Sequence, residues 1–331
     1  MKKTLVVSFY AIIIVTLSIL NTENIWSQSI KNVTYNENNF YSSNYKFPEF
    51  YKGIYLTIGS GKNFEKLSAL IEKSKKSKLN TFVIDVQGSK SKKCVIPKEH
   101  IDFCIKNGFH PIARIVVFPN GLKKYPVSRQ KIINKLIMAE SACQNGFKEI
   151  QFDYIRFNDY SVSENLSLKK RYRFIEGFLK NAKQYLKKYN VKIAADVFGR
   201  IPLNKQDAIG QRMEGLDKVV DIICPMAYPS HYTWSKNLMG DPYYTVLLTS
   251  QKAKERTKKA EIVTYIQAFR MKLKISNLSF NKYIEEQIQA VHDSGIKGFL
   301  LWNASQDYKV PFNVLEKFYT NKASKNISSD I

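Results

Sequence analysis

Three aspartates lie inside otherwise apolar segments of the chain: Asp85, Asp153 and Asp196. Burying a carboxylate is costly unless it is paired, so these positions indicate either ion pairs or chemistry. When two carboxyl groups are held close together, one keeps its proton and can donate it while the other is ionised. Asp153 and Asp196 therefore predict an acid pair that hydrolyses glycosidic bonds. The alternative is an ion-pair layer with Arg114 and Arg156.

The two acids differ in their neighbours along the chain. Asp153 has Arg156 three residues further on, and opposite charge favours the ionised form, which suits a nucleophile or a charge-stabilising group. Asp196 stands between two apolar residues, and apolar surroundings raise the pKa of a carboxyl, which suits a proton donor. Arg114 is expected to orient one of the acids. The reverse assignment stays open, because neighbours across strands are not visible in a sequence.

Aromatic, amide and hydroxyl side chains accompany these acids. The run Cys224–Tyr232 contains two prolines and three polar rings, which is unlike a buried core segment. Rings that stack on apolar sugar faces, together with groups that hydrogen-bond hydroxyls, are typical of carbohydrate sites. His231 is a lone histidine, so we interpret it as sugar-binding or structural and expect no metal and no cofactor. The expected substrate-binding residues are Asp85, Arg114, Gln151, Arg156, Tyr228, His231, Gln267, Trp302 and Asn303.

Apolar, β-branched runs alternate with helical patterns from Tyr51 onward. Such alternation predicts a parallel sheet that helices cover on both faces. Eight units over about 270 residues favour an α/β fold with a single (β/α)8 TIM barrel, whose usual size is about 250 residues. A doubly wound sheet is disfavoured because no G-x-G-x-x-G motif follows the first strand. The expected strands are 53–57, 81–86, 110–118, 149–157, 192–198, 219–228, 263–269 and 298–303.

The expected barrel would bring the acids together. Chemistry in this architecture lies at the carboxyl ends of the strands, where Asp85, Asp153 and Asp196 fall. The period of two along a strand places Asp153 toward the barrel mouth and Tyr154 toward the helices. The expected helices are 64–79, 97–107, 128–144, 168–188, 243–259, 281–293 and 312–319, with a short one after Asp207.

The N-terminus has the pattern of a secretory segment. A short positive start, Met1–Lys3, comes before an almost wholly apolar run, Leu5–Leu20, and a polar stretch follows. We therefore expect a signal peptide or membrane anchor at 1–28, a linker at 29–50, the barrel at 51–320 and a disordered tail at 321–331. The protein would be exported, and then periplasmic, secreted or anchored by that segment, its only membrane contact.

The chain is strongly basic, with 52 lysines and arginines against 28 acids in 331 residues and a net charge of +24. This charge favours an acidic partner such as an anionic polysaccharide, or it is a solvated surface that reflects composition alone. No zinc-finger, RNA-recognition or basic-zipper pattern accompanies the lysines, so we expect no specific nucleic acid. The four cysteines lack C-x-x-C spacing, which argues against a disulfide scaffold or a zinc site.

Seven motifs in this order resemble a bacterial family of glycosyl-hydrolase-like TIM barrels classed as a domain of unknown function. They are the segments 51–57, 83–86, 111–118, 149–157, 195–199, 224–232 and 300–305. The resemblance covers 51 to about 319 and implies polysaccharide hydrolysis, with Asp153 and Asp196 as the candidate acids. The chain departs from the family pattern after Asp85, in the short segment 119–126, and at Ala268, where the family carries an acid.

The sequence is compatible with three functions. The first is an exported glycoside hydrolase that acts on a neutral or anionic polysaccharide or oligosaccharide. The second is a catalytically inactive barrel that binds a glycan at the cell envelope. The third, a basic nucleic-acid-binding protein, is disfavoured by the secretory pattern. A retained acid pair separates the first from the second.

Overall fold

The computed structural model describes residues 45–89, 91–159 and 166–329. The predicted signal or anchor segment at 1–28 lies outside the described residues, as does most of the linker at 29–50. Tyr45–Ile331 forms one compact unit. None of the described helices combines the length and the apolar character that crossing a bilayer requires.

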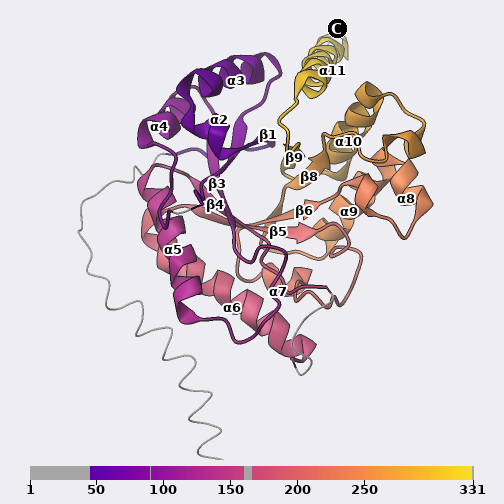
Figure 1. Cartoon of the computed structure of the whole chain (residues 1–331). Coiled ribbons are helices and arrows are strands. Elements are labelled where there is room, and N and C mark those ends of the chain that lie inside the picture. The colour runs from indigo at the N-terminus through magenta and orange to yellow at the C-terminus, as the bar shows by residue number, and fades with distance from the viewer. Residues whose placement is uncertain (1–44, 90, 160–165, 330–331) are drawn as a thin grey trace, which may run out of the picture. The chain divides into compact units, whose positions relative to one another are not determined.

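Parallel strands form a closed barrel with eight strand positions, as predicted (Figure 1). Strand β1 pairs with β2 on one side and with β9 on the other, and the pairing of β5 with β6 completes the ring. The seventh position holds two short strands, because the chain is interrupted at Val263. The strands are β1 Tyr51–Leu56, β2 Thr81–Asp85, β3 His110–Val116, β4 Glu149–Asp153, β5 Lys192–Phe198, β6 Ile222–Met226, β7 Glu261–Ile262, β8 Thr264–Gln267 and β9 Gly298–Trp302.

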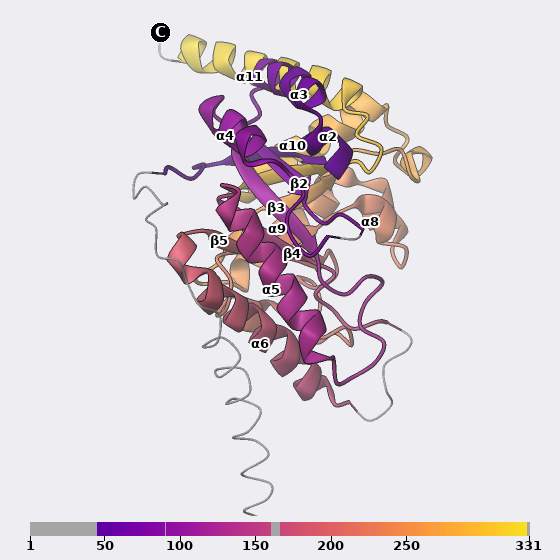
Figure 2. The ribbon, with the colours of Figure 1, turned by 60° about the vertical axis from the view of Figure 1, so that its left-hand side comes forward.

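Helices surround the strands and cover their outer faces (Figures 1 and 2). The helices α5 and α6 lie side by side, and α11 packs beside α3 and α10. The helices are α2 Ile58–Lys62, α3 Phe64–Lys76, α4 Lys98–Lys106, α5 Arg129–Gln144, α6 Leu168–Leu186, α7 Met213–Leu216, α8 Lys236–Gly240, α9 Pro242–Glu255, α10 Phe280–Ser294 and α11 Lys309–Ser329. Short 3-10 turns occur at η1 Lys187–Tyr189, η2 Pro229–His231 and η3 Leu273–Ser276.

Two segments are more ordered than the sequence predicts. The last residues of the expected linker pack on the barrel: the Tyr45 hydroxyl lies 2.8 Å from His110 Nδ1, and Phe50 stacks on His292 at 4.8 Å between ring centroids. At the other end, α11 continues to Ser329 and takes in most of the expected tail at 321–331. That stretch contains neither proline nor glycine, so nothing in it interrupts a helix.

Strand β4 is shorter than predicted and ends at Asp153 instead of Phe157. The reason is Tyr154, whose φ of 52° places its backbone in the left-handed region, where the chain leaves the strand. The alternation of side chains stops at that point. The prediction that Tyr154 faces the helices is therefore wrong, and its side chain lines the cavity described below.

A buried layer of side chains fills the barrel beneath the strand ends. Gln151 is fully buried there, and it accepts a hydrogen bond from the Tyr265 hydroxyl at 2.7 Å. Its amide nitrogen lies 3.1 Å from the sulfur of Cys224. These contacts satisfy an interior polar group, as the low dielectric of a protein interior requires. The layer closes the barrel and supports the residues at its mouth.

Candidate active site

The strand register brings Asp153 and Asp196 to neighbouring positions at the barrel mouth. Gln151 on β4 is paired with Ala194 on β5, and each acid lies two residues further along its strand. Neighbouring strands are about 4.8 Å apart, so the two carboxyl groups are close neighbours. Both line one cavity of about 390 Å³ at the carboxyl ends of the strands. Of the predicted acids, these two share the cavity.

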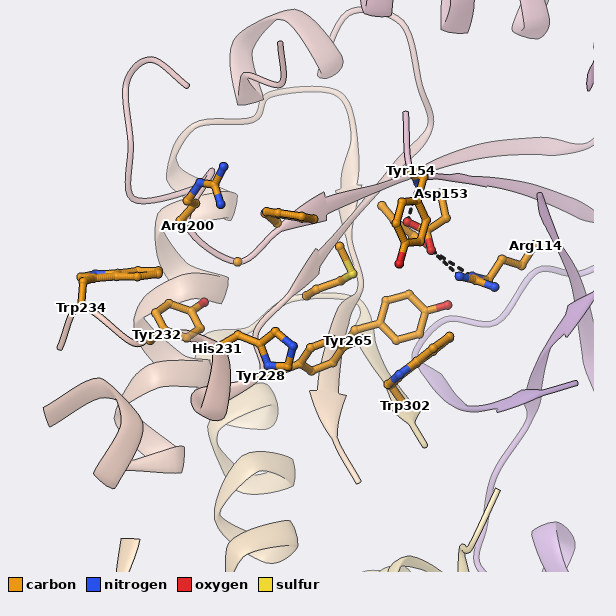
Figure 3. Close-up of a pocket in the computed structure, with 14 residues that line it drawn as sticks. Arg114, Asp153, Tyr154, Arg200, Tyr228, His231, Tyr232, Trp234, Tyr265 and Trp302 are labelled. Atoms are coloured by element: carbon orange, nitrogen blue, oxygen red, sulfur yellow. Dashed lines mark hydrogen bonds and ion pairs between the residues drawn. The ribbon is translucent and has the colours of Figure 1, made fainter. Parts of the chain in front are cut away.

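Arg114 on β3 holds Asp153 and Asp85 at the same time. Its Nη2 and Nε donate to Asp153 Oδ2 at 2.6 and 3.0 Å, and its Nη1 donates to Asp85 Oδ1 at 2.6 Å. The guanidinium is buried and lies 4.9 Å from the centre of the Trp302 ring (Figure 3). The donors of a guanidinium lie in one plane at fixed angles, so Arg114 determines both the distance and the orientation of the carboxylates that it contacts.

Asp153 is held at both of its oxygens. Oδ2 accepts from Arg114, and Oδ1 accepts from the backbone N–H of Tyr154 at 2.6 Å. The left-handed backbone of Tyr154 therefore has two effects on the site. The N–H of Tyr154 points to Asp153, and its ring lines the cavity. These contacts fix the position of the Asp153 carboxyl group in the cavity.

Asp196 has the opposite environment. The residue is 1% exposed, and among the described residues no hydrogen-bond partner reaches its Oδ1. Burial raises the pKa of this carboxyl well above its ordinary value, and the charge of Asp153 raises it further, against a smaller lowering by Arg114. The pair thus combines a carboxyl group that accepts hydrogen bonds at both oxygens with a buried neighbour whose pKa is raised.

Arg156 is not the cation that serves Asp153, which corrects the prediction from its position three residues along the chain. Its Nη1 lies 3.2 Å from Asp159 Oδ2 and 3.0 Å from the carbonyl oxygen of Phe157. The guanidinium lies 4.5 Å from the centre of the Phe198 ring, and Arg156 does not line the cavity. The turn at Tyr154 separates the two side chains, and Arg114 on the adjacent strand holds the carboxylate instead.

The other predicted residues divide into two groups. Tyr228, His231 and Trp302 line the cavity with Arg114 and the two acids. Asp85 lies behind Arg114, where it also accepts from the Tyr55 hydroxyl at 2.5 Å. Gln151, Gln267 and Asn303 are buried, do not line the cavity and bond to other protein groups. Gln151 accepts from Tyr265, Gln267 donates to Phe269 and Met271, and Asn303 donates to Ala268 and Asp307.

The cavity includes residues beyond the predicted substrate-binding set. Phe198, Met226 and Tyr265 belong to strands β5, β6 and β8, and the others come from the segments that follow β4, β5 and β6. Figure 3 labels Tyr154, Arg200, Tyr232, Trp234 and Tyr265 among them. Tyr232 and Tyr265 belong to the aromatic signal of the strand ends, whereas no motif marks Arg200 or Trp234. The additional lining residues are Tyr154, Phe198, Gly199, Arg200, Met226, Tyr232, Trp234 and Tyr265.

The fold is shared with solved carbohydrate-active structures. The PgaB (BpsB) glycoside hydrolase domain from Bordetella bronchiseptica matches 82% of this chain and 99% of its own, with a TM-score of 0.61 and 10% identity. A chitinase from Chromobacterium violaceum covers 81% of this chain and 98% of its own, with a TM-score of 0.55 and 13% identity. The spore cortex-lytic enzyme SleL from Bacillus cereus covers 82% and 75%, with a TM-score of 0.54 and 14% identity.

The sequence itself matches a family. No curated protein matches the chain significantly. A match to a family covers residues 124–308, more than half of the chain, and includes the motifs of Asp153, Asp196 and the Cys224–Tyr232 run. This match confirms the resemblance inferred from the strand-end motifs: the chain belongs to the family described as "Putative glycosyl hydrolase domain".

Proposed function

We propose that the protein is an exported glycoside hydrolase that cleaves a polysaccharide with Asp153 and Asp196. One observation carries the proposal: a carboxylate held by Arg114 stands beside a buried carboxyl whose pKa is raised, and both line one cavity. Two acids with opposite protonation states are what glycosidic cleavage requires.

In the proposed reaction, Asp196 donates its proton to the glycosidic oxygen as the bond to the leaving sugar breaks. Asp153 attacks the anomeric carbon and forms a covalent glycosyl–enzyme ester. Asp196, now ionised, removes a proton from water, and the water oxygen displaces Asp153. A retaining mechanism of this type needs carboxyl groups about 5–5.5 Å apart, which suits side chains on adjacent strands. We therefore expect the product to keep the anomeric configuration of the substrate.

The cavity walls support a sugar substrate. Trp302 lies beside Arg114 at one edge of the cavity (Figure 3). Tyr228 lies beside His231 with 5.4 Å between ring centroids, and Ser230 Oγ is 2.9 Å from His231 Nδ1. Aromatic faces combined with a few directed polar groups bind sugar rings. The similar structures, which include a glycoside hydrolase domain and a chitinase, support a carbohydrate substrate.

Export and the chemical type of the substrate remain parts of the proposal. The positive start and the apolar run Leu5–Leu20 support export as a signal or an anchor. The net charge of +24 is compatible with a substrate in an acidic cell envelope, with attraction that weakens as salt rises.

A glycan-binding barrel without catalysis is the second candidate, and one observation favours it. Ala268, at the end of the seventh strand position, is fully buried and supplies no carboxylate where the family carries an acid. Asp85 makes an ion pair with Arg114 and does not line the cavity, so it offers no replacement.

Substitution of the two acids tests both candidates. Asp153→Asn and Asp196→Asn are each expected to lower the release of reducing ends from a cleaved polysaccharide by at least about a hundredfold, while sugar binding persists. Asp293→Asn, which alters an exposed acid away from the cavity, is the matched control and should keep wild-type turnover.

Three outcomes separate the candidates. Full activity of both cavity variants would contradict the proposed mechanism. A wild-type protein that binds a glycan but releases no reducing ends would establish the binding barrel instead. Inversion of the anomeric configuration, followed by NMR of the fresh product, would remove Asp153 from the nucleophile role and leave it as a base.

A further inference from the structure

The cavity extends beyond the acids to a second end that the proposed reaction does not use. There it is lined by Trp234, which follows η2, and by Arg200, which follows β5. Figure 3 shows both on the opposite side of the cavity from Arg114 and Trp302. This end is therefore continuous with the site of bond cleavage.

The Trp234 ring is exposed to solvent and packs on a buried residue. It is 59% exposed, the largest exposure among the large hydrophobic side chains of the described residues. It packs on Tyr232 with 5.1 Å between ring centroids, and the Tyr232 hydroxyl is 2.6 Å from Thr249 Oγ1. A fixed aromatic face that is open to solvent and borders a cavity suits the apolar face of a sugar.

The backbone beneath Trp234 is fixed as well. The N–H of Ser230 donates to Gln267 Oε1 at 3.1 Å, and the N–H of Ser235 donates to the carbonyl oxygen of Tyr232 at 3.0 Å. Gly199 allows Tyr232 to lie close to β5, because a Cβ at position 199 would be 2.3 Å from the Tyr232 hydroxyl oxygen. Contacts with buried residues therefore hold the backbone near Trp234 and the Tyr232 ring on which Trp234 packs.

Arg200 offers a hydrogen-bond donor at this end of the cavity, and neighbouring carboxylates balance its positive charge. Its Nε and Nη2 donate to Asp207 at 2.8 and 3.1 Å, and Nη2 also donates to Asp159 at 2.6 Å. Two carboxylates therefore compensate the guanidinium. Within the described part of the chain, its Nη1 has no hydrogen-bond acceptor. Such a group suits a neutral hydroxyl or amide oxygen more than a carboxylate.

We propose that Trp234 and Arg200 form a distal sugar subsite, and that the substrate is a chain of several sugar units. One unit stacks on Trp234 while the bond to be cleaved lies at Asp153 and Asp196. This inference rests on the proposed function and adds that the protein selects long chains over short ones. The subsite takes a neutral sugar ring.

Binding to oligomers of increasing length tests the subsite. The probes are chitin and β-mannan oligosaccharides of two to six units, measured by calorimetry on the Asp153→Asn variant so that turnover does not interfere. Adding Trp234→Ala is expected to raise the Kd of hexamers about tenfold, which corresponds to about 1.4 kcal/mol, and that of dimers by less than twofold. Adding Trp234→Phe should restore most of the hexamer affinity.

The controls separate stacking from folding. Tyr244→Ala removes an exposed aromatic side chain on α9 that does not line the cavity, and it should leave every Kd as it is. Equal weakening of dimers and hexamers by Trp234→Ala, or no weakening of either, would overturn the distal subsite while the proposed hydrolase stands. If none of these sugars binds, the neutral-sugar subsite fails, while the proposed function is judged separately by the turnover of the Asp153→Asn and Asp196→Asn variants.

Discussion

Replacing Asp196 with asparagine is expected to stabilise the fold, and to do so more at neutral than at acidic pH. Burial, and then the charge of Asp153, raise the pKa of this carboxyl in the folded protein. In the unfolded chain the same group titrates near the ordinary value of about 3.9. Between these two pKa values, the folded protein holds a proton that the unfolded chain has released. Stability therefore falls as pH rises through this window.

The size of the effect follows from the surroundings of Asp196. A buried polar atom without a partner costs about 1–3 kcal/mol, and Asp196 Oδ1 is such an atom. Each unit of pKa difference contributes about 1.4 kcal/mol where the group would otherwise be ionised. Asparagine does not titrate, and its amide can donate toward Asp153. We expect Asp196→Asn to raise the free energy of unfolding by about 1–3 kcal/mol at pH 7.5 and by less than about 0.5 kcal/mol at pH 4.5.

Urea unfolding at the two pH values, followed by tryptophan fluorescence, measures this difference. Asp207→Asn is the matched control with the opposite sign. Burial alone would raise the pKa of Asp207, but hydrogen bonds from Arg200 and from the Ile209 N–H lower it below the ordinary value. Asp207 therefore stabilises the fold above pH 4, and its replacement should cost stability at both pH values. A loss of stability in Asp196→Asn that is equal at pH 4.5 and 7.5 would refute the reasoning.

Two further substitutions test the support of the site. Arg114→Met is expected to lower the free energy of unfolding by about 3–5 kcal/mol, because Asp85 and Asp153 lose a buried partner that lies 2.6 Å from each. Urea unfolding measures this loss, and a value below about 1 kcal/mol would contradict the shared role of the arginine. Gly199→Ala is expected to cost about 1–3 kcal/mol through the clash with Tyr232, and to weaken binding of long oligosaccharides. Thermal unfolding and calorimetry test it, and wild-type values in both would show that the ring adjusts freely.

The order and type of the barrel elements could be predicted because their signals are local. Apolar strand runs alternate with amphipathic helices throughout, and several helices end where a glycine permits a left-handed backbone. Gly146 has a φ of 96° and Gly295 a φ of 62°, at the ends of α5 and α10. Barrel closure then follows, because eight parallel strands with outer helices leave few other arrangements.

The sequence predicts that Arg114 orients one of the acids, but it does not predict which acid, because the partners lie across strands. Arg156 is near Asp153 in sequence, but the left-handed residue Tyr154 turns it away. Arg114 is far away in sequence, yet the register pairs it with Gln151, two residues before Asp153. Such a turn at a non-glycine residue leaves no reliable mark in a sequence.

The loop residues of the cavity escaped prediction for a related reason. Trp234 follows η2 without any periodic pattern around it, and a single aromatic residue in a loop carries no positional information. Arg200 is one of many basic residues in a chain of net charge +24, so its type alone does not distinguish it. Only the folded chain brings both of them to the cavity that contains Asp153 and Asp196.

The contacts of residues 45–50 set where the folded domain starts. A protease cut before Tyr45 would leave every described contact of the barrel in place. A cut between Phe50 and Tyr51 would instead remove the hydroxyl of Tyr45 from His110 and the ring of Phe50 from His292. His110 Nε2 lies 3.1 Å from Glu149 Oε2 inside the barrel, so water would gain access to a buried pair at the end opposite the acids. A cut between Phe50 and Tyr51 should therefore lower the stability of the barrel, although it removes no residue of the first strand.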